Sequence, residues 1–389
     1  MSVTAPAGFA AAGRACGIKA DGVFDLALVA ADPPRPVAGA GVFTTNGAAA
    51  APVRVSRAHL GATGGRVAAV VLNSGCANAA TGAPGIAAAE LTAAQTAAHL
   101  GVPPESVLVC STGLIGDPLP LAPLLGGLPA LVAGRGSARE DARACARAIL
   151  TTDTHEKEVV IEAGGALIGG MAKGAGMIAP NMATMLCVLT TDADVAPAVL
   201  HEALAVAVGE TFNQLTVDGC TSTNDSVIAL ASGRGPALTP EVLTEGLREA
   251  CSALALELAK DAEGTTRVAR ITVVGARSVD DARRAARRVA ESSLVKTSLF
   301  GADPYWGRIV SELGASGAAF DLDRVSVAYG GVVACAGGVA AAHDRAAAAA
   351  ALAGDVVEIT CDLGLGSAAA TIVTCDLGHG YIDENMKTS

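Results

Sequence analysis

Residues 173–183 read KGAGMIAPNMA, and residues 184–191 continue as TMLCVLTT. The first segment is rich in glycine and contains a proline, which is typical of a loop. The second segment is a run of apolar and β-branched residues, which favours a buried strand. The sequence therefore predicts a loop that ends at Ala183 and a strand that begins at Thr184. The hydroxyl group of Thr184 is then held by a rigid element directly after a glycine-rich loop.

The segments around this junction predict an α/β fold with mixed and antiparallel sheets flanked by helices. Two glycines lie between residues 158–162 (EVVIE) and residues 166–169 (ALIG), which indicates a β-hairpin. Apolar runs predict further strands at residues 67–73, 106–110, 184–191 and 268–274. Helical periodicity predicts helices at residues 86–100, 197–208 and 240–260. Because hairpin signals are frequent, a doubly wound parallel sheet is less favoured.

The last third of the chain predicts a second, smaller α/β domain. Strands are expected within residues 325–335, 356–361 and 371–375, with an alanine-rich helix between the first and second of these segments. Ser278, followed three positions later by Asp281, is typical of the N-terminus of a helix.

Composition excludes several classes of protein. Of 389 residues, 51% are hydrophobic and 17% charged, which excludes a disordered chain. The formal net charge of −11 argues against electrostatic binding of nucleic acid, which requires clustered basic residues. Residues 118–134 are uncharged, but they contain four prolines and are too few for a regular membrane-spanning helix. No signal peptide is expected, because no basic segment precedes the apolar N-terminal residues.

The ten cysteines do not form a metal-binding or redox motif. No two of them are closer than 14 residues, so there is no C-x-x-C unit. The six histidines likewise lack metal-ligand spacing, and no metal is expected. Scattered cysteines of this kind are typical of buried free thiols in a reducing, cytoplasmic environment.

Thr184 could cut the chain and then act as a nucleophile. Its hydroxyl could attack the Ala183 carbonyl to give an ester, which water would then open. The freed α-amine would titrate at roughly 7.7–8.0 and could accept the proton of the hydroxyl near neutral pH. The same residue is also an ordinary start for a buried strand, so the junction alone leaves both interpretations open.

Eight segments together resemble one known family. The segment at residues 173–186 (KGAGMIAPNMATML) resembles the self-cleavage motif of the ornithine acetyltransferase family, the bifunctional glutamate N-acetyltransferases of arginine biosynthesis. Other segments agree in order along nearly the whole chain, at residues 73–82 (NSGCANAATG), 111–116 (STGLIG), 151–154 (TTDT), 216–225 (TVDGCTSTND), 261–264 (DAEG), 294–297 (LVKT) and 303–308 (DPYWGR).

The resemblance implies a self-processing acetyltransferase with an N-terminal-nucleophile-like fold. Cleavage between Ala183 and Thr184 would give an α chain of residues 1–183 and a β chain of residues 184–389, assembled as α2β2 in the cytoplasm. Residues 1–183 would form the first part of the catalytic domain with the oxyanion-hole loop, residues 184–275 would complete it, and residues 276–389 would form the C-terminal domain with a substrate-binding tail. The acetyl group would move from N2-acetylornithine to glutamate through acetyl-Thr184. No cofactor is implied, although acetyl-CoA is a further candidate donor.

The resemblance also assigns roles to single residues. Thr112 and Gly113 match the oxyanion hole, which stabilises the negative oxygen of each tetrahedral intermediate. Substrate contacts are implied for six positions, namely Thr151, Lys173, Thr184, Glu263, Asn385 and Ser389. A cation such as Lys173 suits the α-carboxylate of both substrates, and a carboxylate such as Glu263 suits the side-chain ammonium of ornithine.

Three features depart from the family pattern. Cys220 stands where the family usually has aspartate, Tyr305 stands where it usually has asparagine, and the C-terminal residues 381–389 are shorter and more polar than usual. These departures bear on the acceptor and on the use of acetyl-CoA, and they leave room for a variant enzyme of specialised metabolism. An amidase or aminopeptidase with the same threonine nucleophile also fits the sequence, as does a binding protein that retains the cleavage loop.

Overall fold

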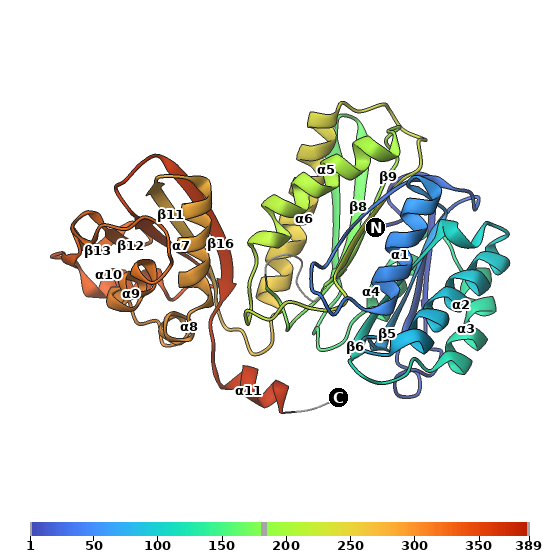
Figure 1. The fold of residues 1–389 in the computed structure, drawn as a ribbon, viewed down its shortest axis with the longest axis horizontal. Helices are drawn as coiled ribbons and strands as arrows, with labels where there is room; N and C mark the ends of the chain where they lie inside the picture. Colours follow the sequence, from blue (N-terminus) through green and yellow to red (C-terminus); the bar gives the residue numbers. More distant parts are fainter. Residues whose placement is uncertain (1, 180–184, 387–389) are drawn as a thin grey trace. The chain divides into compact units, whose positions relative to one another are not determined.

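The computed structural model describes residues 2–179 and 185–386, and the chain divides into two compact units (Figure 1). The first unit contains the residues up to Asn213 together with Cys220–Leu258. The second contains Gln214–Gly219 and the residues from Ala259 onward. None of the helices among the described residues is both long and apolar enough to cross a membrane.

A four-stranded sheet forms the first layer of strands in the first unit. Its order is β1 (Phe9–Arg14), β2 (Leu26–Ala31), β5 (Ala69–Cys76) and β6 (Val107–Leu114). β1, β2 and β5 are antiparallel neighbours, whereas β6 runs parallel to β5. All six residues of β2 are buried, because both faces of this sheet are covered.

A six-stranded mixed sheet forms the second layer. Its order is β4 (Arg66–Val67), β3 (Val37–Phe43), β10 (Ser226–Ala231), β9 (Leu186–Thr191), β8 (Ala166–Lys173) and β7 (Lys157–Ala163). Only β9 and β10 pair in parallel. The expected hairpin is present as β7 and β8, and the strand expected from residue 184 is described from Leu186 as β9.

The two sheets of the first unit share a core and have helices on their outer faces. Alternate residues of β2 point in opposite directions, as the period of a strand requires. Ala27, Val29 and Ala31 join a core that also contains Val188 and Ile228 of the second sheet. Leu26, Leu28 and Ala30 join a core with the helices α1 (Ala51–Thr63), α2 (Gly82–Leu100) and α3 (Leu121–Ala133).

The remaining helices of this unit pack mainly against single strands. α4 (Arg139–Ala148) packs against β1, and α5 (Pro197–Glu210) packs against β3. α6 (Pro240–Lys260) approaches β7 and β8 closely, since a Cβ added at Gly246 would lie 2.6 Å from Ala163 and 2.7 Å from Ile168. This layered arrangement confirms the predicted mixed and antiparallel sheets flanked by helices.

The second unit is built on a third sheet. Its order is β14 (Val339–Ala340), β13 (Val332–Ala336), β12 (Ser326–Tyr329), β15 (Val356–Asp362), β11 (Val268–Ala276) and β16 (Ala368–Cys375). Its helices are α7 (Val279–Glu291), α8 (Ser293–Phe300), α9 (Trp306–Gly314), α10 (Arg345–Ala351) and α11 (His379–Asn385). The predicted helix start is confirmed, because the Ser278 side chain accepts a hydrogen bond from the Asp281 amide.

The structure corrects two boundaries. The C-terminal domain was expected to begin at residue 276, but the second compact unit includes Gln214–Gly219 and then the residues from Ala259 onward. The reason is that β11 pairs with both β15 and β16 and so belongs to the C-terminal sheet. In addition, Thr112 and Gly113 were expected in a loop after a short strand. They lie instead within β6, which continues to Leu114.

Candidate active site

The backbone at Gly113 runs unusually close to the neighbouring strand β5. Thr112 pairs with Ser74 and Cys76, and Gly113 pairs with Gly75. The φ angle of Gly113 is +130°, and a Cβ at this position would lie 2.3 Å from the Gly75 carbonyl carbon. Only glycine combines this backbone conformation with this close approach. Glycine at position 113 is therefore a requirement of the strand pairing itself.

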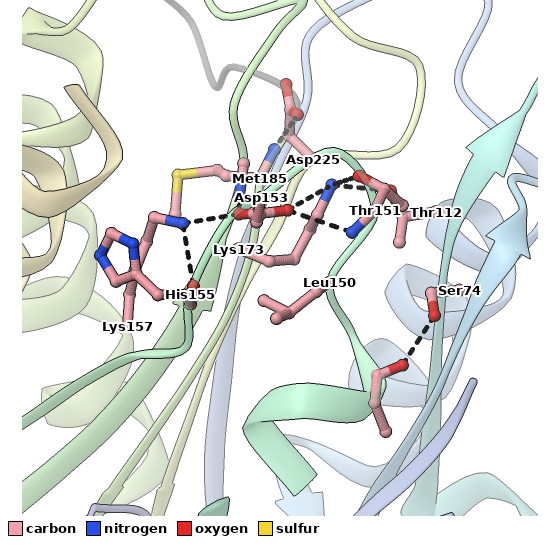
Figure 2. A network of polar contacts seen from close by, with 12 residues as sticks. Ser74, Thr112, Leu150, Thr151, Asp153, His155, Lys157, Lys173, Met185 and Asp225 are labelled. Atoms are coloured by element: carbon pink, nitrogen blue, oxygen red, sulfur yellow. Dashed lines mark hydrogen bonds and ion pairs between the residues drawn. The ribbon is translucent and has the colours of Figure 1, made fainter. Parts of the chain in front are cut away.

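Lys173 brings two other predicted site residues together. It is the last residue of β8, and it is 2% exposed rather than solvated in a loop. Its Nζ donates hydrogen bonds to Thr151 Oγ1 at 2.6 Å and to Thr112 Oγ1 at 3.3 Å. Figure 2 shows the lysine side chain reaching both threonines. Residues from three separate segments of the sequence therefore meet at one ammonium group.

Asp153 organises this cluster with a second buried lysine. Its Oδ1 accepts hydrogen bonds from Lys157 Nζ at 2.8 Å and from the Gly174 amide at 2.7 Å. Its Oδ2 accepts the Thr151 amide at 3.1 Å and lies 3.7 Å from Lys173 Nζ (Figure 2). Burial alone would raise the pKa of Asp153, but the charges of Lys173 and Lys157 and these hydrogen bonds lower it to about 2.

Sequence reasoning missed Asp153 and Lys157. Asp153 lies inside the quoted TTDT segment, and only the threonines of that segment were considered. Lys157 is the first residue of β7, with a fully buried side chain. A lysine is almost never fully buried without a partner, so its burial identifies it, but burial is not visible in the sequence.

A small cavity opens beside Thr112. Its volume is about 280 Å³, close to the lower end of the range of roughly 300–1,000 Å³ typical of small-molecule sites. Its lining residues come from four stretches of the first unit, namely Ala77, Thr112 to Ile115, Met177 and Ser222 to Asn224. Leu114, Ile115 and Met177 give it apolar walls. The predicted oxyanion residues therefore line a pocket with space for a small ligand.

The predicted nucleophile and cleavage point, Ala183 and Thr184, lie outside the described residues. The next residue along the chain, Met185, donates a hydrogen bond from its amide to Asp225 Oδ1 at 3.0 Å (Figure 2). Asp225 is fully buried, and burial raises its pKa well above the ordinary value for aspartate. Asp225 is the last residue of the quoted segment 216–225, and sequence reasoning gave it no role.

The structure brings Glu263 and Asn385 together in the second unit. Asn385 Nδ2, on α11, donates a hydrogen bond to Glu263 Oε2 at 2.7 Å. A Cβ at Gly264 would lie 2.2 Å from the Tyr381 amide nitrogen, so glycine allows this helix to approach. Ser389, the last predicted contact residue, lies outside the described residues.

Cys220 and Tyr305, the two positions that depart from the family pattern, are both accessible to solvent. Cys220 is exposed, and Tyr305 is 55% exposed, with the Arg308 guanidinium carbon 5.6 Å from its ring centroid. The ten cysteines are thiols that form no disulfide bond, as expected. All are buried except Cys220 and the half-buried Cys16.

Comparison with known proteins gives consistent matches over the chain. The model of the ArgJ family matches residues 10–388. The arginine biosynthesis bifunctional proteins ArgJ of Mycobacterium leprae and Thermobifida fusca are each 47% identical to this chain. The alignments cover 100% of this chain and 96% and 100% of those proteins, respectively.

A solved structure agrees with these sequence matches. The crystal structure of arginine biosynthesis bifunctional protein argJ from Bacillus halodurans is 36% identical, with a TM-score of 0.50. The match covers 51% of this chain and 97% of that chain. Together with the match of the family model over nearly the full length, these relatives establish that the chain belongs to the ArgJ family.

Proposed function

We propose that this protein moves the acetyl group of N2-acetylornithine to glutamate, giving ornithine and N-acetylglutamate in arginine biosynthesis. Membership of the ArgJ family supports the reaction class, since the relatives are named as bifunctional proteins of arginine biosynthesis. The observation that carries the proposal for this chain is the contact of Lys173 with Thr112 and Thr151 beside the 280 Å³ cavity.

The first step of the proposal is self-cleavage. The Thr184 hydroxyl attacks the Ala183 carbonyl, the C–N bond breaks, and the released amine takes up the proton while an ester forms. Water then hydrolyses the ester and restores the hydroxyl. The α-amine of Thr184 is now free and, with a pKa of roughly 7.7–8.0, can act as the general base for later turnovers.

The second step is acetyl transfer by a ping-pong route. The Thr184 hydroxyl attacks the acetyl carbonyl of N2-acetylornithine, the amide C–N bond breaks, and ornithine leaves with the proton. The amine of glutamate then attacks the acetyl ester, N-acetylglutamate forms, and the hydroxyl is regenerated. Each half-reaction passes through a tetrahedral intermediate whose oxygen is negative.

Thr112, Gly113 and Lys173 suit the stabilisation of that oxygen. In the proposal, the Thr112 hydroxyl and the Gly113 amide donate hydrogen bonds to it, and Lys173 supplies a positive charge beside the hydroxyl. A donor of this kind typically contributes about 3 kcal/mol to the transition state, and more where water is excluded. The burial of Lys173 supports this role, because buried charges interact more strongly than solvated ones.

Substrate recognition is assigned to two groups of residues. Thr151 and Lys173 would contact the α-carboxylate that both substrates carry, through hydrogen bonds and charge. From the family resemblance we assign further substrate contacts to Glu263, Asn385 and Ser389, and the Glu263 carboxylate suits the side-chain ammonium of ornithine. The hydrogen bond between Asn385 and Glu263 supports assigning these two residues to the same group of substrate contacts.

Two finer points belong to the same proposal. Acetyl-CoA would serve as a second acetyl donor to Thr184, in keeping with the word bifunctional in the names of the relatives. The processed chains would assemble as α2β2, in line with the family resemblance. Acetylation of glutamate with acetyl-CoA as sole donor tests the first point, and the mass of the native particle tests the second.

Ornithine release with and without glutamate tests the central reaction. The proposal predicts that release from N2-acetylornithine becomes catalytic only when glutamate is present, with N-acetylglutamate formed in equal amount. Release at the same rate without glutamate, with free acetate as product, would instead identify a hydrolase. No release under either condition would favour a binding protein.

A further inference from the structure

Asn224 holds the strand end that carries the predicted oxyanion residues. Its side-chain Nδ2 donates hydrogen bonds to the Ala77 carbonyl at 2.6 Å and to the Ser111 carbonyl at 2.9 Å. Ala77 directly follows β5, and Ser111 directly precedes Thr112 on β6. The peptide plane between Ser111 and Thr112 is thus fixed from the side of its carbonyl, and Asn224 is only 5% exposed.

Asp225, the next residue, holds the start of β9. Its Oδ1 accepts the Met185 amide at 3.0 Å, and the amide of the following residue, Ser226, donates to the Met185 carbonyl at 3.1 Å. Both polar groups of the Met185 backbone are therefore bound at the start of β10. The Asp225 backbone carbonyl accepts the Thr44 amide at 3.0 Å, which ties this dipeptide to the end of β3 as well.

We propose that Asn224 and Asp225 are positioning residues that together set the separation between the Thr112–Gly113 segment and the start of β9. One peptide unit joins the two side chains, so a shift of either strand end is transmitted directly to the other. The inference rests on the proposed function, in which the nucleophile is covalently attached to Met185 and must meet the oxyanion donors. A misplacement of about 1 Å can cost about 100-fold in rate.

We refer to Asn224 and Asp225 together as the clamp. Asn224→Asp is the sharpest test of the role of Asn224 in it. The substitution keeps the shape of the side chain but turns the donor toward Ala77 and Ser111 into an acceptor. On fully cleaved enzyme we expect kcat for acetyl transfer to fall about 100-fold, with KM for N2-acetylornithine changing less than about 3-fold. An unchanged kcat would overturn the proposal, as would a loss that lies entirely in KM.

Asp225 is tested by a conservative and a disruptive variant. Asp225→Asn keeps an oxygen that can accept the Met185 amide, so we expect self-cleavage and transfer within about 3-fold of the wild type. Asp225→Ala removes the acceptor, and self-cleavage, followed by denaturing mass spectrometry, should slow at least about 10-fold. If the alanine variant cleaves as fast as the wild type, Asp225 has no positioning role.

Two controls separate positioning from loss of stability. Asn78→Asp is the control for Asn224→Asp, because it makes the same exchange at a fully buried amide that donates to the Gly85 carbonyl. Asp376→Ala is the control for Asp225→Ala, because it removes a buried carboxylate that accepts the Thr266 amide in the second unit. Each should lower the unfolding midpoint as much as its counterpart but leave kcat within about 3-fold. A kcat loss in Asn78→Asp equal to that in Asn224→Asp would overturn the proposal.

The double variant and a milder variant complete the test. If the two residues act as one clamp, their effects on kcat should not be independent. The fold loss of kcat in the double variant Asn224→Asp/Asp225→Ala should then be smaller than the product of the fold losses of kcat in the two single variants. Should Asn224→Asp fail to fold, Ser222→Ala removes only the hydroxyl that accepts the Asn224 amide at 3.0 Å and should lower kcat about 10-fold. An unchanged kcat in Ser222→Ala would contradict the proposed positioning role. So would a kcat loss in the double variant that equals the product of the two single losses.

Failure of this inference can be distinguished from failure of the proposed function. If wild-type protein does not release ornithine in a glutamate-dependent manner, the proposed function fails. If the wild type does so and the variants of Asn224 and Asp225 match it, only the positioning role is wrong.

Discussion

The ammonium group of Lys173, at the end of β8, donates a hydrogen bond to the hydroxyl of Thr112 on β6 over 3.3 Å. These strands belong to the two different sheets of the first unit, and the residues are 61 positions apart. The contact therefore exists only because the sheets pack face to face. It places a buried positive charge beside a hydroxyl that we assign to the stabilisation of an oxyanion.

Removing this charge should impair catalysis strongly. Lys173→Met keeps much of the side-chain volume but removes the ammonium group, and we expect kcat/KM for N2-acetylornithine to fall about 100-fold to 1,000-fold. Steady-state assay of ornithine release measures this. Lys296→Met is the matched control, because Lys296 is a buried lysine whose Nζ donates to Thr374 Oγ1 at 3.1 Å in the second unit. Equal losses in both variants would mean that Lys173 acts only through stability.

Stability should depend on pH through Asp153. Folding lowers the pKa of this carboxyl from its ordinary 3.8 to about 2, so its contribution is present above about pH 4 and is lost as pH falls toward 2. The shift corresponds to about 2 kcal/mol. Asp153→Asn should therefore unfold at a lower temperature than the wild type at pH 6, and the gap should narrow between pH 4 and 2. If the difference in unfolding temperature between the two proteins stays constant over this range, Asp153 is not an ionised carboxylate paired with Lys157 and Lys173.

The close approach at Gly113 should not tolerate a side chain. Gly113→Ala places a Cβ 2.3 Å from the Gly75 carbonyl carbon, so β6 must shift, and we expect kcat to fall at least about 100-fold. Gly101→Ala is the control, since Gly101 also has a positive φ, of +70°, but its added Cβ would meet no atom of the structure within 4 Å. The control should lose about 1 kcal/mol of stability and keep its kcat. Similar kcat values in the two variants would contradict the role of the 113 backbone.

Substrate binding should depend on Asn385. Asn385→Ala removes the hydrogen bond to Glu263, and we expect KM for N2-acetylornithine to rise about 10-fold with kcat nearly unchanged, as for a lost hydrogen bond to a charged group. Asp383→Asn, on the same helix and exposed, is the control and should keep its KM. If Asn385→Ala lowers kcat with KM unchanged, the residue acts elsewhere than in substrate binding.

Much of the fold could be predicted because its signals are local. The hairpin of β7 and β8 follows from two glycines between two strand-like segments, and the start of α7 follows from Ser278 and Asp281. The boundary of the C-terminal unit could not be found in this way. β11 is recognisable as a strand, but its pairing with β15 and β16 depends on residues far along the chain, such as Val356 and Cys375, which both pair with Val268.

The candidate site divides along the same line. Thr112, Gly113, Thr151 and Lys173 were identified through short segments that match a family, and the structure brings three of them into contact. Asp153, Lys157, Asn224 and Asp225 were not singled out, because their importance lies in burial and in partners from other strands. The sequence alone does not show whether a charged or amide side chain is buried or exposed to solvent.

The intact mass of the protein after brief incubation with N2-acetylornithine tests the central claim most directly. We expect two fragments that correspond to residues 1–183 and 184–389, with one added acetyl group on the larger fragment alone, and its loss once glutamate is added. Thr184→Ala should remain a single chain that gains no acetyl group. A fully active wild-type preparation with an uncut chain, or with the acetyl group on the smaller fragment, would contradict the account.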